Sequence, residues 1–220
     1  MTAFFASAAE IEVAFGASEG GSGYAALDHC RPNQPLRLNE MNVALPREGS
    51  PIGSGPLAGL MLAALQRLCD PWDKNALRFL ERYFRFLEQQ LDMNKERVAQ
   101  HLAPFGGLYR PEHVLFSAPA PLPRARIRLG GLQDIHLPFL FWQGAMPVAV
   151  FLQPLRVTPK RARADAERLD QAGIRHISLA ATDMQDDETL FNTVLGAPVM
   201  DFFESEPVPN GPRSRSFVPF

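Results

Sequence analysis

The sequence predicts an α/β (α+β) fold, in which a helical N-terminal half precedes a mixed central sheet with helices on both faces. Two observations lead to this prediction. Residues 124–179 have the pattern of three strands, a helix and a further strand, and residues 73–91 repeat apolar side chains at helical spacing. The chain has 220 residues, of which 46% are hydrophobic and 21% are charged, so it is long enough to bury a sizeable core.

The composition divides the chain into three stretches. Residues 1–55 are a poorly defined N-terminal segment, in which only residues 11–15 alternate as a strand does. Residues 56–200 are expected to form a single α/β domain. Residues 204–220 are rich in proline, serine and arginine, which predicts an extended tail.

Helices are expected in the first part of this domain, over residues 56–104. The strongest pattern covers residues 73–91, where Asp73 is placed to cap the N-terminus. Its charged residues lie largely outside the apolar face. Glu81 and Arg85 are four positions apart there, so we expect them to pair.

The core of the domain is expected over residues 124–180. Strands are predicted at 124–129, 134–142 and 147–153, a helix at 158–172 and a further strand at 174–179. The proline-rich residues 119–123 are expected to be a stiff extended connector. Pro138 predicts an edge or a bulge in the second strand. The single-helix crossover predicts that the last two strands are parallel.

Three sequence features of this core occur in the order of a known nuclease motif. They are Asp134, then Phe141-Trp142-Gln143-Gly144, and then the apolar run Pro147–Gln153. Together they resemble the PD-(D/E)XK (restriction-endonuclease-like) nuclease superfamily over about residues 124–180. The resemblance implies an acidic residue, a hairpin and a strand that ends in Glu-x-Lys, which together hold Mg²⁺ and cleave phosphodiesters.

The chain departs from that motif where the catalytic residues belong. The Glu-x-Lys position is occupied by Phe151-Leu152-Gln153. Phosphodiester hydrolysis needs acidic oxygens for Mg²⁺ and a charge that steadies the attacking water, and Phe151 offers no oxygen. We therefore expect no cofactor. Mg²⁺ enters only if the chain is a divergent nuclease that uses Asp134 and Gln153.

Two histidines suggest a different metal site. Asp134 and His136 share one face of their strand, and His176 lies on a strand of the same core. These three side chains could bind a metal ion, or they could form a polar, solvated face.

Charge is distributed unevenly, although the net charge is only −2. Residues 124–175 contain nine basic and four acidic residues, so this stretch has a net charge of +5. Such a surface can contact phosphates. The candidate nucleic-acid-binding residues are Arg124, Arg126, Arg128, Arg156, Lys160 and Arg161. The alternative is a solvated face with ion pairs such as Arg161 with Asp165.

The remaining features narrow the function only slightly. Two cysteines and no long apolar run favour a reduced, cytoplasmic protein without a membrane span. The leading hypothesis is a non-catalytic, nuclease-fold-like binding or adaptor subunit that binds a protein partner or nucleic acid. One alternative is an assembly or interaction protein with no role in nucleic-acid binding. The other is a divergent metal-dependent nuclease.

Overall fold

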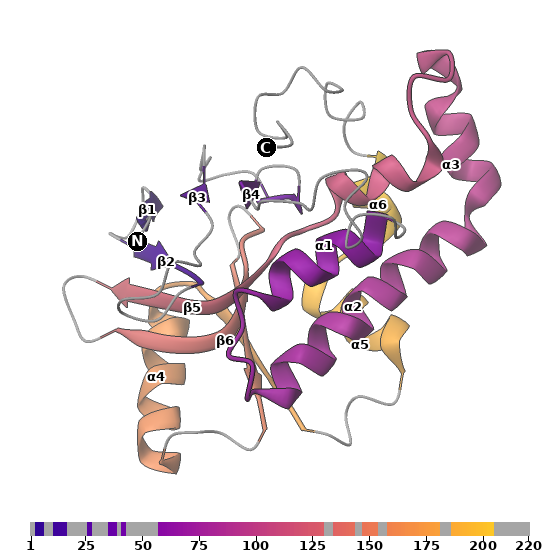
Figure 1. The fold of residues 1–220 in the computed structure, drawn as a ribbon. Coiled ribbons are helices and arrows are strands. Elements are labelled where there is room, and N and C mark those ends of the chain that lie inside the picture. The colour runs from indigo at the N-terminus through magenta and orange to yellow at the C-terminus, as the bar shows by residue number, and fades with distance from the viewer. Residues whose placement is uncertain are drawn as a thin grey trace.

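A six-stranded mixed sheet forms the centre of the computed structural model (Figure 1), with strand order β1-β2-β5-β6-β7-β8. The strands are β1 (Ala3–Ala6), β2 (Ile11–Ala14), β5 (Pro121–Leu129), β6 (Ile135–Phe141), β7 (Val148–Leu152) and β8 (Arg175–Leu179). All neighbours are antiparallel except β7 and β8, which are parallel. The structure describes residues 3–6, 11–16, 26–27, 35–38, 41–42, 57–129, 134–143, 147–153, 158–180 and 186–204. The predicted mixed α/β sheet is confirmed.

The helices surround this sheet. They are α1 (Leu57–Gln66), α2 (Lys74–Met93), α3 (Lys95–Leu102), α4 (Pro159–Gln171), α5 (Asp187–Leu195) and α6 (Val199–Glu204). Two 3₁₀ segments, η2 (Ala103–Phe105) and η3 (Pro111–Ser117), follow α3, and β3 (Ala26–Leu27) pairs with β4 (Met41–Asn42) as a separate small sheet. Within the described residues, no helix is long and apolar enough to cross a membrane.

Aromatic side chains join α2 and α5 to one face of the sheet. Phe79 of α2 lies 4.7 Å from Phe139 of β6 between ring centroids, and Tyr83 lies 5.5 Å from Phe141. Phe191 of α5 contacts both α2 rings. These side chains are fully buried, as the helical spacing of residues 73–91 predicts.

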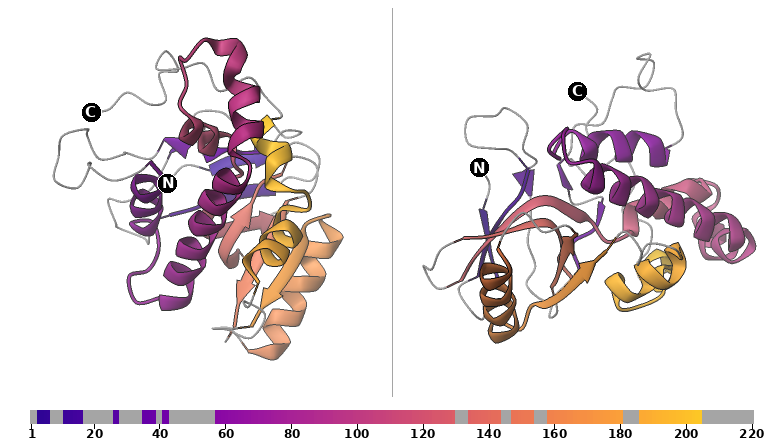
Figure 2. Two further views of the ribbon diagram at one scale, coloured as in Figure 1. Left: turned by 90° about the vertical axis from the view of Figure 1, so that its right-hand side faces the viewer. Right: turned by 90° about the horizontal axis from the view of Figure 1, so that it is seen from below.

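Helix α4 covers part of the opposite face, so the expectation of helices on both faces is confirmed (Figure 2). Thr158 caps α4 by accepting a hydrogen bond from the backbone N–H of Arg161, and Pro159 occupies the first turn. Gly173, with φ 73°, ends the segment in a left-handed conformation that glycine adopts without steric cost.

Helix α5 begins at Asp187. The reason is the Asp186 side chain, which accepts hydrogen bonds from the backbone N–H groups of Glu188 and Thr189 and thereby fixes the N-terminus.

The proline-rich stretch before the core is part of the sheet, so the expected connector over residues 119–123 is wrong. Strand β5 starts at Pro121, which pairs with Phe141, and Leu122 is fully buried. Prolines adopt extended backbone angles, and their carbonyls still accept hydrogen bonds. The Pro123 carbonyl, for example, accepts from the N–H of Gly16 at 2.9 Å.

Pro138 is not on an edge, because β6 lies between β5 and β7. It lies instead at an irregularity within the sheet. The register of β5 and β6 omits the pair that Pro138 would make with Arg124, and Arg124 has a left-handed backbone with φ 49°. The missing N–H of proline removes one ladder bond at this position, which is compatible with the irregular backbone of its neighbour.

The N-terminal segment contributes strands to the fold. Strand β2 forms within residues 11–15, as their pattern predicts, and the structure shows that it pairs with β5 while β1 extends the sheet beyond it. Leu36 is buried and donates its N–H to the Trp142 carbonyl at 2.7 Å. The helical part of the N-terminal half is therefore residues 57–105, whereas the described parts of residues 1–55 are mainly extended. The expected tail after Glu204 lies outside the described residues.

Candidate functional site

Asp134, the acidic residue of the nuclease-like motif, is engaged in an ion pair. Arg128 donates from Nε to Asp134 Oδ1 at 2.9 Å and from Nη2 to Oδ2 at 3.4 Å. The two residues lie opposite one another when the register of Ile127 and Ile135 is continued by one position. The carboxylate that would bind Mg²⁺ is thus bound to a guanidinium from the neighbouring strand.

The Glu-x-Lys position is occupied by side chains with structural contacts. Phe151 is 8% exposed, and its ring lies 6.5 Å from that of His176. Gln153 donates from Nε2 to Ser178 Oγ at 2.8 Å. Asp134 is therefore bound to a residue of β5, and Gln153 is bound to a residue of β8. These two strands lie on opposite sides of the β6–β7 hairpin.

The two histidines are in different surroundings. His136 is exposed on β6 and lies opposite Arg126 in the register. His176 Nδ1 lies 3.1 Å from Asp170 Oδ1 at the end of α4. Among the residues that the structure describes, no three His, Cys, Asp or Glu side chains are grouped as metal ligands. The described residues thus do not bring Asp134, His136 and His176 together.

The basic surface predicted for nucleic acid (Arg124, Arg126, Arg128, Arg156, Lys160 and Arg161) includes ion pairs of Arg128 and Arg161, and neighbouring arginines of α4 are paired as well. Arg161 Nε lies 3.6 Å from Asp165, which also accepts from Arg168 at 3.4 Å, and Arg163 pairs with Glu167 at 3.1 Å. Lys160 is exposed at the start of α4. Arg156 lies outside the described residues.

Arg124 lies near a different part of the molecule than Arg126 and Arg128 do. Burial raises the pKa of the Cys69 thiol to about 12, with a smaller contribution from Asp73, whereas the charge of Arg124 lowers it. Arg124 therefore lies within Coulombic reach of the segment that joins α1 to α2. Its left-handed backbone interrupts the strand alternation, which alone would have placed it beside Arg126 and Arg128.

A second basic feature lies along α2, where the sequence indicates only a solvated face. Lys74, Arg78, Arg82 and Arg85 follow one another at intervals of four, four and three residues, which puts them in one row on the helix. The row borders a pocket of about 540 Å³, which is lined by these four residues together with Leu77, Glu81 and Asp187. We call this cavity the α2 pocket. The expected pair of Glu81 with Arg85 is not formed: Glu81 accepts a hydrogen bond from Gln66 of α1 at 3.3 Å.

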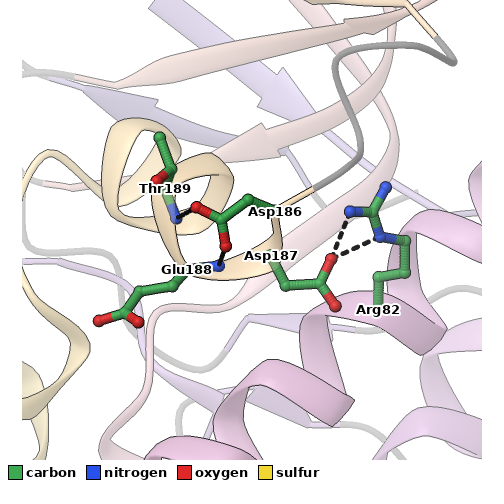
Figure 3. Close-up of polar contacts among 5 residues, drawn as sticks. All are labelled: Arg82, Asp186, Asp187, Glu188 and Thr189. Atoms are coloured by element: carbon green, nitrogen blue, oxygen red, sulfur yellow. Dashed lines mark hydrogen bonds and ion pairs between the residues drawn. The ribbon is translucent and has the colours of Figure 1, made fainter.

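Arg82 and Asp187 both line the α2 pocket, and they pair with one another (Figure 3). Arg82 Nε donates to Asp187 Oδ1 at 2.6 Å, and Nη2 pairs with the same oxygen. The two side chains are 8% and 18% exposed. The third nitrogen, Nη1, is buried and has no hydrogen-bond partner.

The N-terminus of α5 holds Asp187 in this position. Asp186 binds the first backbone N–H groups of the helix, and hydrogen bonds from Thr189 lower the pKa of its carboxyl (Figure 3). Asp187 is the first residue of α5 and therefore faces α2 from a fixed helix end. The row on α2 was visible as a spacing in the sequence, but its acidic partner lies 105 residues away, and only the fold reveals it.

No family model, curated protein or solved structure matches this chain.

Proposed function

We propose that this protein is a non-catalytic binding or adaptor subunit built on a nuclease-like sheet. The proposal rests on the contacts that the side chains at the three motif positions make. Phe151 is buried against His176, Gln153 is bound to Ser178, and Asp134 is bound to Arg128. Each of these contacts stabilises the sheet or its edge. A catalytic site at these positions would therefore require the three side chains to give up their present partners.

The chemistry of metal-dependent hydrolysis supports the same proposal. Mg²⁺ prefers carboxylate oxygens and water, and a second carboxylate would have to come from the position of Phe151. A metal ion at Asp134 would also have to displace Arg128 from both carboxylate oxygens. A catalytic lysine is missing from the motif, because Gln153 occupies its place.

The partner surface that we propose is the outer face of β5 and β6 together with α4. It carries Arg126, Arg128, Lys160 and Arg161. The ion pair of Arg128 with Asp134 is partly exposed, and such pairs contribute only about 0–1 kcal/mol. Acidic side chains of a partner protein can therefore replace the internal carboxylates at little cost. Nucleic-acid phosphates would use the same cations, and a cytoplasmic location is part of this proposal.

Binding and cleavage assays test the proposal together. The tagged protein is used to capture partners from a lysate of its source cells and is titrated with labelled duplex and single-stranded DNA at low and high salt. We expect capture of a partner that is lost in the Arg126→Ala/Arg128→Ala variant. The matched control, Arg67→Ala/Lys95→Ala, removes the same charge from exposed positions outside this surface and should retain the partner.

The cleavage arm decides between a binding protein and an enzyme. We expect no cleavage of DNA or RNA with Mg²⁺ or Mn²⁺ in wild type. Metal-dependent cleavage that disappears in Asp134→Ala would overturn the proposal and establish the divergent nuclease instead. DNA binding that weakens with salt and requires Arg126 and Arg128 would identify nucleic acid as the ligand of this surface.

A further inference from the structure

The α2 pocket combines a concave shape with an excess of positive charge. Its lining contains four cations and two carboxylates, which leaves two positive charges in excess. Asp187 is paired with Arg82, and Glu81 is bonded to the neutral side chain of Gln66. In the described part of the chain, no carboxylate lies within ion-pair distance of Lys74, Arg78 or Arg85.

The row of cations is unfavourable without an anion. Like charges at neighbouring positions on a helix face repel one another, and this row places four in succession. Glu81 lies between Arg78 and Arg85 but is bonded to Gln66, whereas in α4 the carboxylates of Asp165 and Glu167 pair with arginines of the same helix. An anion bound in the α2 pocket would be attracted by these cations and would offset the repulsion among them.

Arg82 provides the second, independent indication of a ligand. It is 7% exposed, lines the pocket and has a buried Nη1 without any hydrogen-bond partner. Buried donors are nearly always satisfied, and an unsatisfied one is costly. Asp187 binds Nε and Nη2, so both N–H groups of Nη1 are left without an acceptor oxygen.

The lining also limits the chemistry of the ligand. Leu77 is the single apolar residue among the described lining residues, and no aromatic ring is present for a base to stack on. The volume of about 540 Å³ is that of a small-molecule site rather than of a long groove. Arginine forks match the oxygens of phosphate groups especially well.

We propose that the α2 pocket binds a small ligand through a diphosphate group, with Arg78 and Arg85 as the exposed contacts and Arg82 as the buried one. Two linked phosphates carry enough negative charge to neutralise the excess and can span successive turns of α2, which lie about 5.4 Å apart. Asp187 is a positioning residue in this arrangement, because it fixes the orientation of Arg82 and does not itself donate a hydrogen bond to the anion.

Calorimetric titration of the full chain with inorganic pyrophosphate tests this proposal. We expect one pyrophosphate per chain, and affinity reduced by about tenfold or more in Arg78→Ala/Arg85→Ala, since charge-assisted hydrogen bonds are lost. The control Arg67→Ala/Lys95→Ala removes the same charge from exposed positions outside the pocket and should change the affinity less than about twofold. All of these residues are exposed, so the variants should fold.

Three further titrations distinguish the sources of the phosphate and the competing explanations. Inorganic phosphate should bind more weakly than pyrophosphate, and an organic diphosphate should bind at least as well if the group is recognised as part of a larger ligand. Absence of pyrophosphate binding, or an equal loss in the control variant, would overturn the proposal. So would binding of duplex DNA that depends on Arg78 and Arg85 in the absence of pyrophosphate binding, because α2 would then be a polyanion surface.

Discussion

The two basic regions of this molecule differ in how their charge is balanced. In the basic surface formed by β5, β6 and α4, most arginines have an acidic partner close by. Arg128 pairs with Asp134, six residues away, and Arg161 pairs with Asp165, four residues away. In the α2 pocket, the paired carboxylate is Asp187, which comes from a different helix and serves Arg82.

A count of charges along the sequence does not locate a binding surface. The stretch of residues 124–175 is the most basic in the sequence, yet much of its charge is used internally. Arg175, for example, donates to the carbonyls of Thr193 and Val194 at 2.7 and 2.9 Å and so binds the C-terminal end of α5. The α2 row has fewer cations but retains more of its charge.

The largest effect that we expect comes from the buried pair. Arg82→Ala should lower the free energy of unfolding by about 3–5 kcal/mol, because it leaves the Asp187 carboxylate without its partner. Urea-induced unfolding measures the effect. Arg78→Ala, in the same row but exposed, should change stability by less than about 0.5 kcal/mol.

A double variant sharpens this prediction. Arg82→Leu/Asp187→Leu removes both charges and should be more stable than Arg82→Ala, since no uncompensated charge remains. If Arg82→Ala is as mild as Arg78→Ala, the pair is not buried in solution, and the contrast between the two regions disappears.

The sequence predicts the elements of this fold well, because most are determined locally. Helix α2 follows from its apolar spacing and its cap, and Asp73 indeed accepts a hydrogen bond from the backbone N–H of Ala76 at 3.1 Å. The parallel pairing of β7 and β8 follows from the single-helix crossover. The predicted start of strand β5, at residue 124, is three residues too late, because the prolines before it predict a connector but form extended, buried backbone.

The candidate sites were predicted less well, because they depend on contacts between distant residues. The departure at Phe151 and Gln153 could be seen in the sequence, but the bond of Asp134 to Arg128 needed the register of β5 and β6. Asp187 has no signal at all in the sequence other than its place in the first turn of a helix. Its contact with Arg82 arises only when α5 packs on α2.

The position of Arg124 gives the next prediction, which tests whether this residue belongs to the basic surface. In a Cys30→Ala background, the ultraviolet absorbance of the Cys69 thiolate should appear only near pH 12 in the folded protein. Arg124→Ala should raise the pKa of Cys69 further, because a nearby positive charge is lost, whereas Arg126→Ala should leave it unchanged. An equal change in the pKa of Cys69 in both variants would mean that Arg124 and Arg126 lie in the same environment.

The same thiol affects stability at high pH. Because the pKa of Cys69 is raised from 9.0 to about 12 by folding, its contribution is fully present below pH 9. The contribution is lost as the pH rises towards 12, since the unfolded chain gives up the proton first. Unfolding experiments between these pH values should show a shallower loss of stability in Cys69→Ala than in wild type.

The cap of α4 gives a smaller effect that is confined to one region. Thr158→Ala removes the hydrogen bond to the N–H of Arg161 and should cost about 1 kcal/mol of stability. It should weaken partner binding by the basic surface, because Lys160 and Arg161 lie in the first turn of α4. Pyrophosphate binding by the α2 pocket should not change. A parallel loss of both activities would show that the two regions are coupled.

The smallest effect concerns the ion pair that defines the basic surface. A double-mutant cycle on Arg128 and Asp134 should give a coupling energy of about 0.2–1 kcal/mol, because both side chains are partly exposed and solvent screens them. Added salt should reduce it further. The same cycle on Arg82 and Asp187 should give a larger coupling that salt hardly changes, since that pair is buried. If the Arg128 pair proved the stronger, its cation would be held too tightly to be exchanged, and the basic surface would be structural rather than a site for a partner.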